Sequence, residues 1–320
     1  MSQITTSMFH YVRPSNQGAQ PFLKAFSLED FREFLDTLVS RGKVIDPQDY
    51  FNALEGQRPL APDTHLLTFD DGLSDHYQWV FPELQKRSLR ALFFVTSGPL
   101  AEERLLKIHK THALYGAKGY SWLKEQFLRL AHPDGRVPMG MYTNEKSAAA
   151  YPYDDAPTAG FKYALNYLIP AAEAEMILDR LLADSFDENA LAREFYLSRE
   201  QIKEMSDAGM QFGYHGHTHQ PFSRLNSAEL EKEMDHSERL LGALLPSPPI
   251  CLSYPYGDTS AVSEDNFLYL RKRGIRAAFL AEHTQILGDP LRLPRTDCAE
   301  WFRCRHLGCD EAKSGPADRL

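Results

Sequence analysis

Short apolar runs alternate along most of the chain with segments whose apolar residues recur at helical spacing. Several of these runs are continuously apolar, as strands buried on both faces of a sheet are. Such alternation of strand and helix is typical of βα units around a parallel sheet or barrel. The predicted strands are Ser7–Val12, Leu66–Phe69, Ala91–Thr96, Gln211–Tyr214, Ile250–Tyr254, Ala277–Ala281 and Leu291–Pro294.

Three of the predicted helices have recognisable beginnings. Ser27–Asp30 resembles a helix start, and apolar residues follow it at helical spacing. Ser198–Gln201 and Ser227–Leu230 open two later helices in the same way. We assign the apolar stripe of the first helix to the core; it consists of Phe31, Phe34, Leu35, Leu38 and Val39.

Residues 99–197 interrupt the alternation with helix-like polar segments and a stretch rich in Pro, Tyr and Asp at 151–158. We interpret them as a long insertion within a single catalytic domain that spans residues 1–320. An insertion after a barrel strand lies over the usual active-site face, so it predicts a cap that sets substrate specificity. The alternative is a helical cap that serves oligomerisation. The oligomeric state is not predicted by the sequence.

The composition indicates a globular protein with acidic charge. The chain has 320 residues, 43% of them hydrophobic, which suffices for a substantial core. Its formal charge of -9 disfavours nucleic acid and anionic membranes as partners. The basic runs Arg271–Arg273 and Arg303–His306 are short. Neither a signal-like start in Met1–Val12 nor an apolar run of about 18 residues is found, so we expect a cytoplasmic protein without a membrane span.

Four cysteines in a chain of this length are too sparse for a disulfide scaffold. We expect free thiols in a reducing compartment. Three of the cysteines lie close together and near His306, so a structural zinc site is the alternative, although no CxxC pair is present. The cysteines are Cys251, Cys298, Cys304 and Cys309.

Two adjacent acids end the predicted strand Leu66–Phe69. Asp70 and Asp71 are followed by Gly72, a tripeptide that is also good turn chemistry. Two carboxylates at a strand end can share a cleft, where one ligates a metal while its neighbour acts as a base.

Three histidines within five residues follow the predicted strand Gln211–Tyr214. The outer two, His215 and His219, are four residues apart and close enough on a helical turn to share one ion. A core or surface role explains one histidine easily but explains three poorly, so metal binding is favoured. One carboxylate and two imidazoles would leave coordination positions for water and substrate, as a catalytic ion requires.

These motifs resemble those of the polysaccharide deacetylase family, also called the NodB-homology family or carbohydrate esterase family four. Thr68–Gly72 matches the family's TFDDG motif, and His215–His219 matches His-Ser/Thr-x-x-His with glycine in place of the hydroxyl residue. The resemblance implies a distorted (β/α) barrel of the NodB-homology type, here with a long, mainly helical insertion. It also implies that Asp70 is the general base, while Asp71, His215 and His219 hold a divalent metal, with Zn²⁺ as the expected ion, and His217 is not a ligand.

Two further motifs depart from the family pattern. Ser253–Gly257 is similar to the family's Arg-x-Pro-Tyr motif, so Tyr256 would hold the oxyanion through its backbone N–H. Ser253 stands where many members have arginine, and another group should supply that charge. We predict that Arg295 and Asp297 orient Asp70 and tune its pKa; a surface ion pair is the alternative.

The family's general acid, a histidine on an apolar Leu-x-His segment, has no convincing match. The candidates are His10 on the first strand and His306 in a polar context. The third possibility is that neither histidine is the general acid. In that case the leaving amine would receive its proton through Asp70 or water.

The sequence therefore predicts a metal-dependent hydrolase that removes an N-acetyl group from an acetamido sugar, or from a sugar-containing precursor, and releases acetate. In the cytoplasm, a soluble, nucleotide-linked or lipid-linked sugar is the expected substrate. The alternatives are a hydrolase of a cyclic amide or ureide on the same fold, and a carbohydrate-binding protein without activity. Residues of the insertion that could line the substrate site are Tyr151, Tyr153, Asp154, Asp155 and Lys162.

Overall fold

The computed structural model describes residues 4–14, 23, 25–42, 44–57, 64–131, 145–150, 156–281 and 289–298. By their contacts, the residues divide into two compact units, which are treated separately below. The barrel unit comprises Met1–Ser15, Ala25–Arg104 and Ala192–Arg303. The helical unit comprises Asn16–Lys24, Leu105–Leu191 and Cys304–Leu320.

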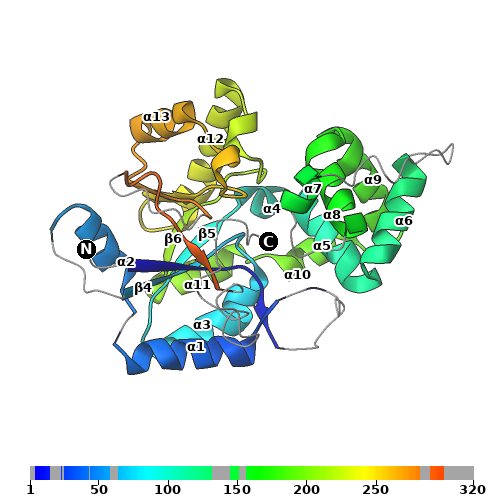
Figure 1. Cartoon of the computed structure of the whole chain (residues 1–320). Coiled ribbons are helices and arrows are strands. Elements are labelled where there is room, and N and C mark those ends of the chain that lie inside the picture. The colour runs from blue at the N-terminus through cyan, green and yellow to red at the C-terminus, as the bar shows by residue number, and fades with distance from the viewer. Residues whose placement is uncertain are drawn as a thin grey trace. The chain divides into compact units, whose positions relative to one another are not determined.

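A seven-stranded sheet forms the centre of the barrel unit; β4, β5 and β6 are labelled in Figure 1. Its strands pair in parallel in the order β8-β7-β6-β5-β4-β1-β9. Because all strands run the same way, their carboxyl ends meet at one edge of the sheet. The strands are β1 (Ile4–Phe9), β4 (Thr64–Phe69), β5 (Leu92–Val95), β6 (Gln211–Tyr214), β7 (Cys251–Ser253), β8 (Ala277–Phe279) and β9 (Thr296–Asp297).

One segment of the chain, residues 290–297, brings the two edges of this sheet together. Its Leu293 forms a parallel bridge with Phe279 of β8, and its backbone N–H donates to the Ala278 carbonyl over 2.9 Å. The same segment then continues into β9, which pairs with β1. The sheet is thereby curled into a distorted (β/α) barrel, and the predicted fold class is confirmed.

Five of the predicted strands are found to within two residues at each end, and the other two predictions are wrong. The prediction Ser7–Val12 is wrong in its limits, because β1 ends at Phe9 and a separate β2 (Val12–Arg13) pairs with β3 (Phe26–Ser27) in a second small sheet. The prediction Leu291–Pro294 is also wrong as a regular strand. Only Leu293 of that segment bridges β8, and the regular pairing begins at Thr296.

Helices flank the barrel strands, and polar side chains cap the beginnings of α1, α2, α11, α12 and α13. Ser27 accepts from the backbone N–H of Asp30 and starts α1, as predicted. Ser198 forms the predicted capping box at α11, whereas α12 is capped by Asn226, one residue before the predicted Ser227. The helices are α1 (Leu28–Ser40), α2 (Pro47–Leu54), the π-helix His76–Val80, α3 (Phe81–Lys86), α4 (Ser97–Glu102), α11 (Arg199–Asp207), α12 (Ser227–Leu244) and α13 (Glu264–Lys272), with 3₁₀ turns at Phe222–Arg224 and Thr259–Ala261.

Aromatic side chains of three neighbouring strands stack in the core. The ring of Phe69 stacks on Phe9 at 5.1 Å and on Phe93 at 4.9 Å between centroids. All three rings are buried, and such contacts add to the stabilisation from burial itself. Phe69 directly precedes Asp70, so this stack fixes the point where β4 ends. Four residues of the predicted α1 stripe are buried, but Val39 is 43% exposed.

The helical unit is built from short helices around its own apolar core. Phe127 packs edge-on against Phe161, with 5.4 Å between ring centroids. Lys110 is buried, and its ammonium lies 2.5 Å from Asp179 and 3.2 Å from Glu175, which offsets its desolvation. The helices are α5 (Lys107–Lys118), α6 (Tyr120–Ala131), α7 (Glu145–Ala150), α8 (Ala156–Tyr163), the π-helix Ala164–Leu168 and α9 (Ala171–Ala183); α10 (Glu188–Phe195) spans the boundary between the units.

The predicted insertion, residues 99–197, overlaps the Leu105–Leu191 segment of the helical unit. Residues at both ends of the predicted range belong to the barrel unit instead. The role of the insertion as a specificity cap stays a prediction. Within the described part of the chain, no helix has the length and apolar character needed to cross a membrane.

Candidate metal centre

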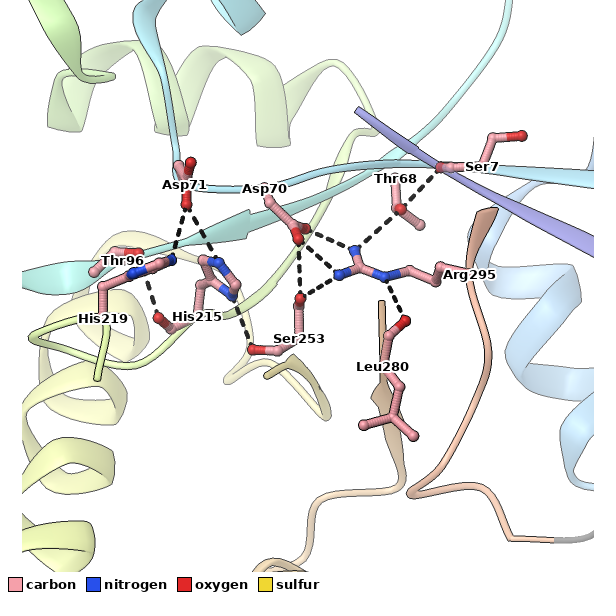
Figure 2. Close-up of polar contacts among 10 residues, drawn as sticks. All are labelled: Ser7, Thr68, Asp70, Asp71, Thr96, His215, His219, Ser253, Leu280 and Arg295. Carbon is pink, nitrogen blue, oxygen red and sulfur yellow. Dashed lines mark hydrogen bonds and ion pairs between the residues drawn. The ribbon is translucent and has the colours of Figure 1, made fainter. Parts of the chain in front are cut away.

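The chain turns sharply after β4 and sends two neighbouring carboxylates in different directions. The backbone N–H of Asp70 still donates to the Phe9 carbonyl over 2.9 Å, so Asp70 continues the sheet. Asp71 and Gly72 then adopt left-handed backbone conformations, with φ of 74° and 68°. As Figure 2 shows, Asp71 points toward two imidazoles, whereas Asp70 points toward Ser253 and Arg295.

The two outer histidines of the predicted motif meet Asp71 at one oxygen. The Nε2 atoms of His215 and His219 each lie 3.3 Å from Asp71 Oδ1 (Figure 2). His215 follows β6 and is buried. His219 reaches the same point because its backbone is left-handed, with φ of 57°. The three residues predicted as ligands are therefore brought together in space.

The donor set fits a divalent metal ion. One carboxylate oxygen and two imidazole nitrogens lie within 4.8 Å of one another. Donor atoms held about 2.1 Å from a tetrahedral ion stand about 3.4 Å apart, close to the spacing found here. The Nδ1 of His215 is 2.9 Å from the Ser253 carbonyl, to which it donates, so the Nε2 lone pair faces Asp71 and is available to a metal.

The electrostatic potential at this site favours a cation. Burial alone would lower the pKa of His215, but the carboxylates of Asp70 and Asp71 outweigh it and raise that pKa above its usual value. A divalent cation would compete with the proton on His215 for the same negative potential.

Asp70 is held by a buried guanidinium and a hydroxyl. Arg295 donates from Nη1 to Oδ1 and from Nη2 to Oδ2, both over 2.7 Å, and Ser253 Oγ donates to Oδ2 over 3.1 Å (Figure 2). Arg295 is itself positioned by donating to the Leu280 carbonyl and to Thr68 Oγ1, at 3.2 and 3.3 Å. This bidentate pairing of Arg295 with Asp70 fixes the plane of the carboxylate.

The pairing also keeps Asp70 ionised. Complete burial would raise its pKa, but the charge of Arg295, followed by that of His215, lowers it to about 2. A carboxylate has about four acceptor positions, and Arg295 and Ser253 occupy three of them. A water molecule beside Asp70 could therefore still donate to it.

Ser253 and Arg295 together resolve the departure from the family motif. The guanidinium expected at position 253 comes instead from Arg295, in the segment that closes the barrel. Ser253 is small enough to leave room for it, and its hydroxyl accepts from Arg295 Nη2 over 2.7 Å. The absence of arginine at position 253 therefore does not by itself favour a carbohydrate-binding protein without activity over an enzyme.

Tyr256 lies beside one of the predicted metal ligands, His219. Its ring centroid is 5.1 Å from that of His219, and its side chain is partly exposed. Its backbone is left-handed, with φ of 65°, and Gly257 follows in the same conformation. A Cβ on Gly257 would stand 2.6 Å from the backbone nitrogen of Ala281, so only glycine fits there. The role of the Tyr256 N–H in holding an oxyanion stays a prediction.

The remaining predicted residues have different outcomes. Asp297 lies in β9 opposite Met8, and its predicted influence on Asp70 stays untested. His10 directly follows Phe9, whose carbonyl accepts from the Asp70 N–H, so His10 lies near the site. Several of the residues singled out in the sequence lie outside the described part of the chain: Tyr151, Tyr153, Asp154, Asp155, Cys304, His306 and Cys309.

Two other predictions concern residues that the structure describes. Cys251 and Cys298 are buried free thiols, and burial raises the pKa of both. Lys162 lies on α8 in the helical unit, with its ammonium 5.6 Å from the centre of the Tyr120 ring.

Sequence reasoning missed His76, which lies in the π-helix after the DDG turn. It is buried against Phe69, and burial lowers its pKa to about 4, so the ring is neutral at pH 7. Its Nε2 is 3.0 Å from the carbonyl of His10, to which the neutral ring donates. His76 lies six residues beyond Asp70 and belongs to no recognised motif. No local signal in the sequence therefore indicated that its ring contacts the backbone of His10.

Comparisons with known proteins agree with this site. The polysaccharide deacetylase family model matches residues 141–278, which include His215, His219 and Ser253. The resemblance to the polysaccharide deacetylases is confirmed. Asp70 and Asp71 precede the matched residues and Arg295 follows them, so their place at the site comes from the geometry. No curated protein matches the chain in sequence.

Solved structures share the fold at low sequence identity. The chain is similar to IcaB from Ammonifex degensii, with a TM-score of 0.55, 20% identity and coverage of 93% of this chain and 92% of that one. It is also similar to the Streptococcus pyogenes deacetylase PplD in complex with acetate, at TM-score 0.56 and 15% identity over 92% and 91% of the chains. A de-N-acetylase from Aggregatibacter actinomycetemcomitans matches at TM-score 0.55 and 15% identity, over 91% and 93%.

Proposed function

We propose that this protein is a divalent-metal-dependent hydrolase that removes an N-acetyl group from an acetamido sugar and releases acetate. The observation that carries the proposal is the convergence of Asp71, His215 and His219 next to a carboxylate, Asp70, held ionised by Arg295. The similar PplD structure is of a deacetylase in complex with acetate, and the A. actinomycetemcomitans protein is a de-N-acetylase. Both support an acetyl group as the group removed, and the second supports an amide as the bond to be cleaved.

Zinc held by the three ligands would polarise the amide carbonyl and make water more acidic. Asp70 accepts the proton of the attacking water, because it is ionised at neutral pH and has an acceptor position left. Arg295 and Ser253 keep its carboxylate in one orientation, so little reorganisation is needed during the reaction. Water adds to the carbonyl carbon, the carbon–nitrogen bond breaks, and acetate and an amine are the products.

Two donors complete this proposal. The backbone N–H of Tyr256 stabilises the negative charge that develops on the carbonyl oxygen. His10, near Asp70, is the candidate that protonates the leaving amine. Substitution of His10 by Gln tests this role, because it should reduce kcat while zinc binding is unchanged.

Acetate release from a panel of acetamido sugars tests the proposed activity. The zinc-loaded protein should release acetate, whereas Asp70→Asn should lose about 10²–10⁴-fold in kcat and still bind one zinc. Turnover of cyclic amides or ureides in place of acetamido sugars would favour the alternative hydrolase. Saturable sugar binding without any turnover would favour a binding protein.

The cytoplasmic location expected from the sequence stays part of the proposal. It makes soluble, nucleotide-linked and lipid-linked acetamido sugars the first substrates to test. Fractionation of cells, with detection of the protein in membrane, soluble and secreted fractions, would contradict it if the protein were found mainly outside the cytoplasm.

A further inference from the structure

The short segment between the two histidine ligands is held by one carboxylate. Glu233 Oε2 accepts from the backbone N–H groups of His217 and Thr218, at 2.6 and 2.9 Å. Glu233 Oε1 accepts from the Thr218 hydroxyl over 2.5 Å. All three donors therefore belong to residues that lie between His215 and His219, and all point to a single side chain.

Glu233 itself lies on the buried face of α12 and is only 6% exposed. A carboxylate without hydrogen bonds would be costly there, because burial removes it from water. Charge-assisted bonds to backbone N–H groups are among the stronger hydrogen bonds in proteins. The hydrogen bonds from His217 and Thr218 therefore offset the cost of burying Glu233.

The opposite side of the same segment is held by the start of α4. The backbone N–H of Ser97 donates to the Gly216 carbonyl at 3.1 Å, and that of Gly98 donates to the His217 carbonyl at 2.9 Å. A Cβ on Gly98 would lie 2.4 Å from this carbonyl oxygen, so the close approach requires glycine.

The side chain of His217 contacts residues of both α4 and α12. Its Nδ1 is 2.9 Å from Ser97 Oγ, and its ring stacks on His236 of α12 with 4.6 Å between centroids. His217 is thus turned away from the ligand trio and anchors the segment between α4 and α12.

This support matters because the backbone at the second ligand is strained. His219 has a φ of 57°, a conformation that costs free energy for a residue other than glycine and persists only where the surroundings impose it. The contacts to Glu233 are therefore part of what holds residues 216–218, and through them His219, in that conformation.

We propose that Glu233, acting through Thr218, is a positioning residue that presets His215 and His219 for binding a divalent cation. The inference rests on the metal centre of the proposed function. It extends that function to a residue on a helix that contributes no ligand.

Zinc affinity of the full-length protein, measured by competition with a chromophoric chelator, tests the inference. Thr218→Val keeps the shape of the side chain but removes the hydroxyl, and Thr218→Ser keeps the hydroxyl as its matched control. Glu233→Gln should weaken zinc binding about 10–100-fold, as loss of outer contacts to metal ligands does, and Thr218→Val by about 3–10-fold. Thr218→Ser should stay within about twofold of the parent.

A spectroscopic measurement separates positioning from general destabilisation. In the cobalt-substituted protein, Thr218→Val should shift the visible absorption bands, because the ligands are displaced, while Thr218→Ser should superimpose on the parent spectrum. Melting curves in the presence of EDTA identify variants that are folded at the assay temperature. If Glu233→Gln does not fold, the Thr218 pair decides the question.

The outcomes distinguish this inference from the proposed function. A parent protein that binds no zinc would contradict the metal centre itself. A parent that binds zinc, with equal affinity and an equal cobalt spectrum in folded Thr218→Val and Glu233→Gln, would overturn the positioning role alone.

Discussion

At the scale of single residues, the arginine partner of Asp70 shows how one function is divided between two positions. Ser253 is uncharged, and it donates a hydroxyl hydrogen bond to Asp70. Arg295 enters from the closing segment and pairs with both carboxylate oxygens. The orientation of the proposed base therefore depends on the geometry of a guanidinium rather than on positive charge alone.

Arg295→Lys tests this dependence. Lysine keeps the charge but cannot make two parallel hydrogen bonds, so Asp70 should lose its fixed orientation. We expect kcat to fall by about 10–100-fold, with KM and zinc content little changed, because Asp70 is not a ligand. Steady-state kinetics together with zinc analysis check this result.

The control for this substitution is Arg292→Lys, an arginine of the same segment that pairs with Glu264 at the surface. It should retain kcat. Loss of zinc in Arg295→Lys, or an unchanged kcat, would contradict the role assigned to the guanidinium.

At the scale of elements, ion pairs join α1 and α3 across a buried acid. Glu83 of α3 is 4% exposed, and its carboxylate lies 3.0 Å from Arg32 of α1 and 2.8 Å from both Lys86 and Arg87. Arg87 also pairs with Asp36 of α1 at 2.7 Å. Burial would raise the pKa of Glu83, but the hydrogen bonds from Lys86, Arg87 and Arg32 lower it to about 2.

This shift predicts a dependence of stability on pH. Because the pKa of Glu83 is lower in the folded than in the unfolded state, its contribution to stability is present above about pH 5 and is lost between about pH 5 and pH 2. Glu83→Gln should lower the free energy of unfolding by about 1–3 kcal/mol at pH 7 and by much less near pH 2. Urea unfolding at several pH values measures the difference.

Glu33→Gln is the matched control, since Glu33 is an exposed glutamate of α1. It should change stability by less than about 0.5 kcal/mol at any pH. Glu83→Gln and the parent protein could instead differ in free energy of unfolding by the same amount at pH 7 and at pH 3. That result would show that the ionised form of Glu83 contributes nothing to stability.

At the scale of the whole molecule, the site exists only where distant segments of the barrel unit meet. Asp71 follows β4, whereas His215 and His219 follow β6, and β5 lies between these two strands. Because parallel pairing sets the carboxyl ends of β4, β5 and β6 at one edge, side chains that follow different strands can share an ion. An unfolded chain does not hold these ligands together, so zinc should bind the folded state far better.

Zinc should therefore raise the melting temperature of the barrel unit. At a concentration a thousandfold above the dissociation constant, the stabilisation is about 4 kcal/mol, or about 8–16 °C for a unit of this size. Calorimetry with zinc and with EDTA measures the shift, and His219→Ala should abolish it. Identical melting curves of the parent protein in zinc and in EDTA would contradict a metal site at Asp71, His215 and His219.

The sequence by itself determined the alternation of strands and helices, the helix starts at Ser27 and Ser198, and the positions of Asp70, Asp71, His215 and His219 at strand ends. These features are local, because a strand, a cap or a turn is specified by a few neighbouring residues. The strand limits near Val12 and Leu291 were wrong, because bridges to distant strands decide where pairing begins.

Only the tertiary structure decided which side chains support the site. Arg295 replaces the arginine absent at position 253 because the barrel closes through its segment. Glu233 meets the histidine segment because α12 packs beside it, although an acid on the buried stripe of a helix was a signal in the sequence. Such contacts join residues far apart in the chain, and the direction of each side chain becomes defined only when the strands and helices are packed.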